Sequence, residues 1–482
     1  MINSLLTALL VLTSLFPLYR GREYATVRAE GRVEGGAFRN IYDPELGVRG
    51  LVGAEGVMLR KGLMLQGRFD YSYDYGTRSR WRGWIDPYES PFMLCDSIPG
   101  NISQETYDME ASLAIPAGKW RFGINAGYRA TIFAKHKDLR NKNTRMDLTV
   151  APSVAWCGDK FRAGLALGYL RNTEQVEYMQ VDGSSEKYLF RLYGLWLYSS
   201  SGFSSAENRR YKENSGVFSD LRLEYENGAL RIGNDFHVRY SYGSQTETGY
   251  NNLHYGDTQC LDYRDDFSLQ AGAHRVSAFW EMGQTLGLRS LQRQELDPDS
   301  NIRRWYSYGG LTECYSRSRM RAGGLYRFGK ERWSVSAGLN WMSETQYYRE
   351  YPILFTQRLS LLEPHLAGFA RFGLGEKAGW LELEASARYS LPLTAVPDDI
   401  TVLGGMETEE SETQLLAPLF EEFHYRSASR IGAGLNVRWT LPLPRRGRSL
   451  DFGIGVQHTS ALGGPMNGLS RSAGSLAVHY HF

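Results

Sequence analysis

The chain has 482 residues, and its 55 basic and 53 acidic side chains give a net charge of +2, which provides no electrostatic footprint for nucleic acid. Apolar residues make up 42% of the chain, but no segment beyond the amino terminus is apolar for the ~18 residues that a membrane helix needs. This excludes a protein that crosses a membrane by helices. The aromatic share of 13% and the 52 glycines are typical of a membrane β-barrel.

The amino-terminal 18 residues contain an apolar stretch that is too short for a comfortable transmembrane helix. No Lys or Arg precedes this stretch, and no small-x-small cleavage site is evident. Its position and length nevertheless indicate a secretory signal. We therefore predict a signal peptide at residues 1–20, with its cleavage point left open, and one β-barrel domain over residues 21–482.

From Tyr24 onward, apolar and polar residues alternate, as they do in strands whose two faces meet different surroundings. Along 120–132, for example, Trp120, Phe122 and Ile124 lie on one face, and Arg121 and Gly123 lie on the other. A soluble β-sandwich would alternate in the same way. Five tryptophans at expected strand ends on the apolar face favour anchoring at a membrane interface instead: Trp120, Trp156, Trp333, Trp341 and Trp439.

Short and long connections also alternate along the chain. Short turns are expected at 60–62, 116–118, 157–159, 226–228, 271–273, 329–331, 375–379 and 444–448. Longer segments are expected around 76–103, 181–215, 249–257 and 391–415. Eight hairpins plus a first and a last strand predict an all-β, transmembrane antiparallel up-and-down barrel of about 18 strands (16–18). Residues 188–198 also look like a strand, and we place them in an extracellular hairpin outside the wall because counting them would break this alternation.

The last ten residues, 473–482, alternate Leu476, Val478, Tyr480 and Phe482 with polar residues. A strand that ends in Phe resembles the final strand of bacterial outer-membrane β-barrels. The resemblance implies that this strand pairs with the first strand and is recognised by the barrel-assembly machinery. It also implies outer-membrane lipid as a partner and the bacterial outer membrane as the location.

The segment 81–92 contains the pattern Asp86-Pro-Tyr-x-x-Pro-Phe. In this pattern the chain resembles an uncharacterised family of bacterial outer-membrane β-barrels, a domain of unknown function. The resemblance implies a fold and a location but no substrate. TonB-dependent transporters resemble the chain only in having a barrel, and because alternation begins directly after the signal we expect no N-terminal plug domain.

The sequence contains no motif that predicts an enzyme, and we expect no cofactor. There is no nucleophile elbow, no phosphate-binding loop and no His-Glu-x-x-His. His479 and His481 share a face, but we interpret them as polar lumen residues and predict no metal site. A Cys260–Cys314 disulfide is permitted in an oxidising compartment, although the spacing does not establish it.

The polar faces of the expected strands carry many charges. Residues expected to line the lumen are Arg68, Arg121, Arg129, Arg162, Arg319, Arg321, Glu382, Glu384, Arg388 and Arg438. They could brace the wall by pairing or could select anions, and we favour bracing. Aromatic residues expected in outer loops are Trp81, Trp84, Tyr88 and Trp196. They could bind a partner or cover the barrel mouth.

These observations predict a pore or a transport-associated channel with a mixed-charge, Arg-rich lumen, alone or with a lipoprotein or transporter partner. The alternative is a structural or docking barrel that anchors a lipoprotein or surface complex through its aromatic loops.

Overall fold

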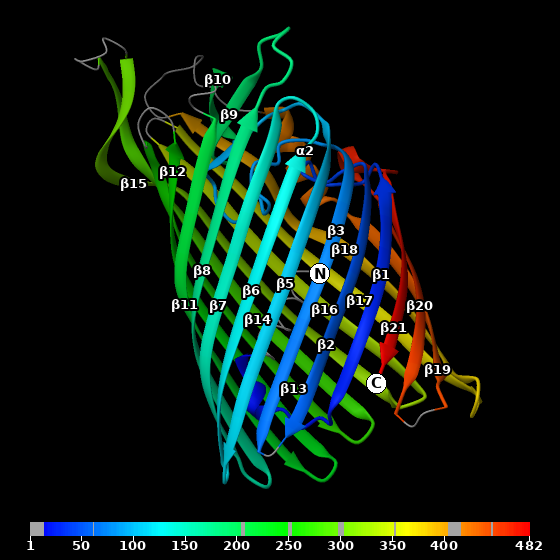
Figure 1. Ribbon diagram of the computed structural model, residues 1–482. Helices are drawn as coiled ribbons and strands as arrows, with labels where there is room; N and C mark the ends of the chain where they lie inside the picture. The colour runs from blue at the N-terminus through cyan, green and yellow to red at the C-terminus, as the bar shows by residue number, and fades with distance from the viewer. Residues whose placement is uncertain are drawn as a thin grey trace.

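The computed structural model describes residues 14–60, 62–203, 208–248, 253–296, 303–350, 353–402, 416–444 and 447–482. The first 13 residues of the expected signal, and parts of the expected long loops around 181–215, 249–257 and 391–415, lie outside these ranges. Within them, eighteen strands form one antiparallel sheet, which closes into a barrel (Figure 1). The predicted barrel and its strand number are confirmed.

The wall strands follow one another around the barrel in chain order. They are β1 (Tyr24–Gly36), β2 (Leu46–Arg60), β3 (Leu63–Ser79), β5 (Gly100–Ala117), β6 (Trp120–Lys135), β7 (Arg140–Cys157), β8 (Phe161–Met179), β11 (Arg209–Asn227), β12 (Leu230–Thr248), β13 (Leu253–Ala271), β14 (His274–Leu296), β15 (Arg303–Lys330), β16 (Trp333–Glu350), β17 (Ile353–Gly375), β18 (Gly379–Val402), β19 (Arg430–Pro442), β20 (Ser449–Ala461) and β21 (Ser470–His481).

The barrel closes where the last strand meets the first. In the antiparallel register of β1 and β21, Val27 lies opposite Tyr480 and Ala29 lies opposite Val478. The backbone N–H of Phe482 donates to the carbonyl of Ala25 at 2.9 Å. The predicted pairing of the C-terminal strand with the first strand is therefore confirmed.

The face that the sequence predicts to be apolar points out of the barrel. Large side chains such as Ile124, Leu167 and Leu476 remain 46%, 57% and 57% exposed. Trp120 lies opposite Trp156 across β6 and β7, and both stand at the short-turn end of the wall. The prediction that Trp341 lies at a strand end is wrong, because β16 keeps pairing with β17 as far as Glu350 and leaves this residue in mid-strand.

All eight predicted short turns join adjacent wall strands. At the other end, several strands run further than the sequence predicts. Residues 391–402, expected in a loop, continue β18, because they still pair with β17. A helix, α2 (Leu416–Ser427), was not predicted, and no helix among the described residues is long and apolar enough to span a membrane.

Residues 188–198 lie outside the wall, as predicted. They contribute β9 (Tyr188–Gly194) and the start of β10 (Leu197–Gly202), which form a small antiparallel sheet with β4 (Met93–Cys95). We call the segment 80–99, the β9–β10 hairpin and α2 together the loop plug.

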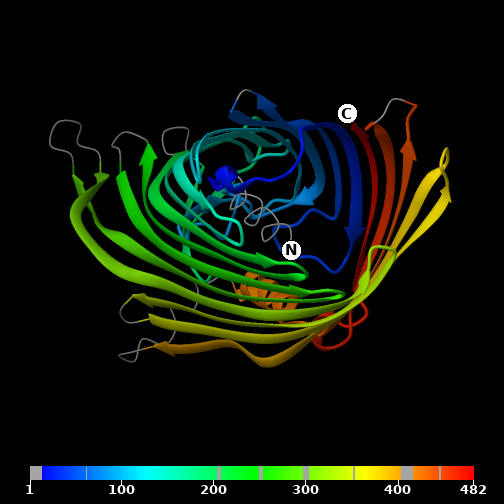
Figure 2. The ribbon, with the colours of Figure 1, turned by 90° about the horizontal axis from the view of Figure 1, so that it is seen from below.

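Figure 2, seen from below, shows α2 and a short N-terminal segment within the ring of strands. The N-terminal segment contains a turn of 3₁₀ helix at Phe16–Leu18.

Candidate functional site

The loop plug has an apolar core of its own, and this core packs on lumen-facing side chains of the wall. Trp81, Trp84 and Phe92 from the first loop join Leu192 and Trp196 from the hairpin. The wall contributes Val176, Tyr178, Tyr255, Tyr315 and Tyr348, and α2 contributes Leu419. The indole N–H of Trp84, which is fully buried, donates to the carbonyl of Phe92 at 2.7 Å and closes the first loop on itself. The plug therefore lies inside the long-loop end of the barrel.

Several plug residues have positive φ angles, which are unfavourable for non-glycine residues unless packing compensates for them. Within the described residues, the non-glycine residues with positive φ are Arg78, Trp81, Leu195 and Trp196, and all lie in the plug or at its edge. The turn between β9 and β10 places Leu195 and Trp196 at φ of 46° and 60°, where Asn-Gly is the usual choice. Because both side chains are buried in the plug core, their burial compensates for the strained backbone.

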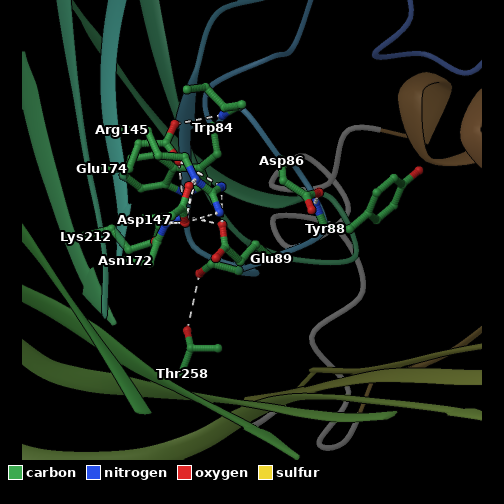
Figure 3. Close-up of polar contacts among 12 residues, drawn as sticks. Trp84, Asp86, Tyr88, Glu89, Arg145, Asp147, Asn172, Glu174, Lys212 and Thr258 are labelled. Atoms are coloured by element: carbon green, nitrogen blue, oxygen red, sulfur yellow. Dashed lines mark hydrogen bonds and ion pairs between the residues drawn. The ribbon is translucent and has the colours of Figure 1, made fainter. Parts of the chain in front are cut away.

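A charged contact holds the first loop to the wall (Figure 3). The carboxylate of Glu89 lies 2.8 Å from a guanidinium nitrogen of Arg145 on β7 and 2.7 Å from Nζ of Lys212 on β11. We call these three residues the latch. Burial alone would raise the pKa of Glu89, but the two cations outweigh burial and lower the pKa to about 2. Glu89 is therefore ionised while the loop is docked.

The wall side of the latch is built around Glu174 of β8, which is fully buried. Its carboxylate accepts hydrogen bonds from the backbone N–H of Ile85 and from Nδ2 of Asn143, both at 2.8 Å, and lies 3.2 Å from Nζ of Lys212. Ser90, which follows Glu89 in the loop, and Thr258 of β13 place their hydroxyl oxygens 3.3 Å apart. Through Ile85, Glu89 and Ser90 alone, the loop thus contacts β8, β11, β12 and β13 besides β7.

Helix α2 contacts the same loop from the other side. Arg80 lies 2.6 Å from Glu421, and the hydroxyl of Tyr88 donates to Glu422 at 2.8 Å. The indole N–H of Trp196 also donates to Glu422 at 2.8 Å. One acidic side chain of α2 therefore joins the first loop to the hairpin.

A cavity of about 60 Å³ remains between the plug and the wall. Tyr88, Trp196, Tyr315, Arg317 and Glu422 are among the residues that line it. A single water needs roughly 10–15 Å³ of such a cavity, so there is space for a few waters. It is too small for a substrate, and the docked plug offers no solute-sized site there.

The charges predicted to line the lumen are mostly paired with carboxylates or guanidiniums. Arg68 lies 3.5 Å from Asp70 and from Asp108, and Arg129 lies 2.5 Å from Asp108. Other ion pairs that involve the predicted residues include Arg162–Glu224, Arg319–Glu281, Arg321–Glu281 and Glu382–Arg438. Arg121 instead donates to the carbonyls of Pro17 and Tyr19, both at 3.0 Å. Glu384 and Arg388 are exposed. Most of these ion pairs join neighbouring wall strands.

Three of the four predicted loop aromatics, Trp81, Trp84 and Trp196, are buried in the plug, whereas Tyr88 is 37% exposed. His479 and His481 contact Glu30 and Asp451. No group of three or more His, Cys, Asp or Glu in the described part of the chain could hold a metal ion. Cys260 and Cys314, both within that part, do not form a disulfide with each other.

Sequence reasoning missed the latch. Glu89 lies inside the Asp86-Pro-Tyr-x-x-Pro-Phe pattern, between its proline residues, and Arg145 and Lys212 lie on the polar faces of their strands. A polar face identifies them as lumen residues, but it does not reveal which loop enters the lumen to meet them.

A family model described as a family of unknown function (DUF6850) matches residues 13–482. No curated protein matches the chain. Among solved structures, the chain is similar to BauA, the ferric preacinetobactin receptor from Acinetobacter baumannii, with 8% identity and a TM-score of 0.42 over 96% of this chain and 80% of that one. It is also similar to a mutant of TodX, a monoaromatic hydrocarbon channel, with 9% identity and a TM-score of 0.35 over 98% and 93% of the two chains. With scores this low, we draw nothing about function from these similarities.

Proposed function

The chain belongs to DUF6850, a family of unknown function, and we propose that it is an exported, integral outer-membrane β-barrel that acts in transport. In this proposal the barrel is a channel with a mixed-charge, Arg-rich lumen, and its own loop plug keeps the channel closed at rest. The observation that carries the proposal is the plug itself, a separately packed core anchored to the lumen wall by the latch.

The outer surface supports a membrane location. Large apolar side chains remain exposed on strands all around the barrel, including Val33, Phe122, Leu167, Val217, Leu339 and Ile454. In water such a continuous apolar surface would far exceed the patches that monomeric soluble proteins expose. A closed barrel with an apolar outer belt meets the requirement that every backbone polar group be paired in lipid.

The interior supports gating rather than a permanent seal. The latch is ionic and polar, and the cavity beside it has space for water, so the plug contacts the wall partly through groups that hydrate readily once released. A permanent seal would favour apolar contact throughout, because buried ion pairs add little net stability compared with well-packed apolar groups.

Planar-bilayer recording of the purified protein tests the proposal. Wild-type protein should conduct rarely, and Trp84→Ala, which removes a fully buried side chain of the plug, should raise the open fraction strongly. Trp439→Ala is the matched control, because this tryptophan lies on the outer face of β19. A folded Trp84→Ala barrel that conducts no more than the wild type would sink the channel proposal.

The docking-barrel alternative has less support. It needs loop aromatics that are free to meet a partner, but Trp81, Trp84 and Trp196 are all committed to the plug core. Co-purification of a lipoprotein with the wild type in mild detergent, together with a Trp84→Ala barrel that does not conduct, would favour the docking barrel.

A further inference from the structure

Residues 14–19 are packed inside the barrel at the short-turn end, in the region that the sequence assigns to the signal peptide. Leu15, Phe16 and Leu18 are each no more than 5% exposed, a level found in a protein core. They contact β5, β6, β7 and β8. A signal segment that is cleaved off does not need to be complementary to the lumen wall, so this close packing favours retention of the segment.

The wall beneath the segment is unusual for a lumen face. Leu15 and Leu18 pack on Ala155 and Ala166, and Phe16 packs in a cluster with Val57, Met64 and Ala114. Further along β5 to β8, towards the long loops, the same lumen face carries Glu110, Arg129, Asp147 and Glu174. We call this small and apolar part of the wall the cradle. If nothing covered the cradle, its apolar surface would be exposed to water in the lumen, which is unfavourable.

Glycine at one position of the cradle is required by the segment itself. A Cβ added at Gly164 would lie 2.7 Å from Cδ1 of Leu18 and 3.3 Å from Cδ2 of Leu15, and its nearest neighbours all belong to the segment. The wall is therefore hollowed at the place where these two leucines lie.

Polar contacts fix the segment along its length. Arg121 donates to the carbonyls of Pro17 and Tyr19, which a helix turn this short leaves without internal partners. At the start of the segment, the hydroxyl of Ser14 donates to Asp220 on β11 at 2.5 Å. Directly after the segment, Arg20 lies 3.4 Å from Glu226. The apolar side chains of the segment thus pack on the cradle, and its free backbone carbonyls accept hydrogen bonds from the wall.

We propose that residues 14–19 remain in the mature protein, with any signal cleavage on the amino-terminal side of Ser14, and that they are the resident ligand of the cradle. The sequence assigns residues 1–20 to a signal peptide and leaves the cleavage point open, and the proposal places any cleavage before residue 14. The segment then occupies the β5–β8 side of the lumen at the end opposite the loop plug. The inference requires export but does not require that the barrel conduct.

The first test is the intact mass of the protein purified from outer membranes. We expect a chain that begins at or before residue 14. A mature chain that begins after residue 14 would overturn the proposal, whatever the conductance of the barrel, so this result and the channel proposal fail independently.

The second test asks whether the retained segment lies in the cradle. Ser14→Cys is treated with a maleimide, and peptide mass spectrometry measures labelling at residue 14 alone, so that the native cysteines do not interfere. Labelling should be slow, and the added Gly164→Leu should speed it by roughly tenfold or more, because the new side chain takes the space of Leu18.

Gly453→Leu is the matched control for this labelling. Gly453 lies on the lumen face of β20, and a Cβ there meets only ordinary contacts at 3.5 Å and beyond. Labelling in this variant should stay within about twofold of Ser14→Cys alone, since the segment keeps its site. Equal labelling with Gly164→Leu and with Gly453→Leu would contradict the proposed site even if the mass test succeeds.

Discussion

The wall and the loop plug are built by different rules from one chain. Each wall strand pairs with the wall strands before and after it, and only the seam between β1 and β21 joins distant parts of the sequence. The plug brings together the segment 80–99, the β9–β10 hairpin and α2, which are far apart in the chain. Wall contacts repeat a local pattern, whereas plug contacts do not.

The two regions also use apolar side chains in opposite ways. The wall turns Phe122, Leu167 and Leu476 outward, where they remain exposed, and the plug buries Trp84, Phe92 and Leu94 completely. In the proposed membrane location, lipid surrounds the first set, whereas the second set makes an ordinary protein core. A destabilising substitution in one region should therefore leave the structure of the other region intact.

Trp84→Ala should have the largest effect. Removing a fully buried tryptophan from a core costs about 3–5 kcal/mol, and here that loss falls on docking of the plug. Hydrogen exchange of residues 80–99 should accelerate, while the wall strands keep their protection. Equal loss of protection in the wall would show that the two regions are not separate.

Leu167→Arg should destabilise the wall and leave the plug unchanged. Leu167 faces outward between Leu165 and Tyr169, and an Arg near the middle of an apolar belt costs roughly 2–4 kcal/mol. The free energy of unfolding in lipid, measured by denaturant titration, should fall by this amount. Leu167→Ile keeps the side chain apolar, so its free energy of unfolding should match that of the wild type. In a folded Leu167→Arg barrel, hydrogen exchange of the plug should also match that of the wild type.

Glu89→Gln should release the first loop less completely than Trp84→Ala. It leaves Arg145 and Lys212 near Asp147 and Glu174, so part of the charge compensation survives. The side chain of Glu89 is 21% exposed, and we expect a loss of about 1–3 kcal/mol in docking. Limited proteolysis within 80–99 should quicken, and unchanged proteolysis would show that the latch does not hold the loop.

Acid should act through the same carboxylate. The pKa of Glu89 falls from an ordinary 4.5 to about 2 on docking, so its contribution is full above pH 4.5 and is lost as the pH falls towards 2. Proteolysis by an acid protease should therefore speed up over this range. Because Gln does not titrate, Glu89→Gln should lack the part of this dependence that the wild type owes to Glu89.

Arg438→Ala should have the smallest effect. Its pair with Glu382 spans 3.2 Å, but the Arg438 side chain is more than half exposed, and exposed pairs contribute about 1 kcal/mol or less. Neither wall stability nor plug protection should change by more than this. Denaturant titration measures wall stability, and hydrogen exchange measures plug protection. A large loss in either would mean that the barrel depends on individual ion pairs in its wall.

The wall could be predicted because its signal is local. Alternation, the eight short turns and the parity set by the last strand were sufficient to give the strand number and the seam. The errors at Trp341 and at residues 391–402 share one cause: the strands continue beyond the apolar belt, where alternation between apolar and polar residues fades.

The site could be predicted only in part. Polar-face residues such as Arg68 and Arg129 were placed in the lumen, because parity determines the face. That Trp84 would be buried and that Glu89 would meet Lys212 depend on how loops fold back, and no spacing in the sequence encodes this. The turn at Leu195 and Trp196 lacks the usual Asn-Gly, so even its local signal was absent.

A reversible bridge between the plug and the wall would show whether the loop plug closes a channel. Ser90→Cys with Thr258→Cys replaces two hydroxyls that lie 3.3 Å apart, one on the plug loop and one on the wall. In the Trp84→Ala background, we predict that forming this bridge abolishes the current in planar bilayers and that reductant restores it. Neither variant with only one of the two introduced cysteines should respond in this way. A current that persists while the bridge is formed would contradict the claim.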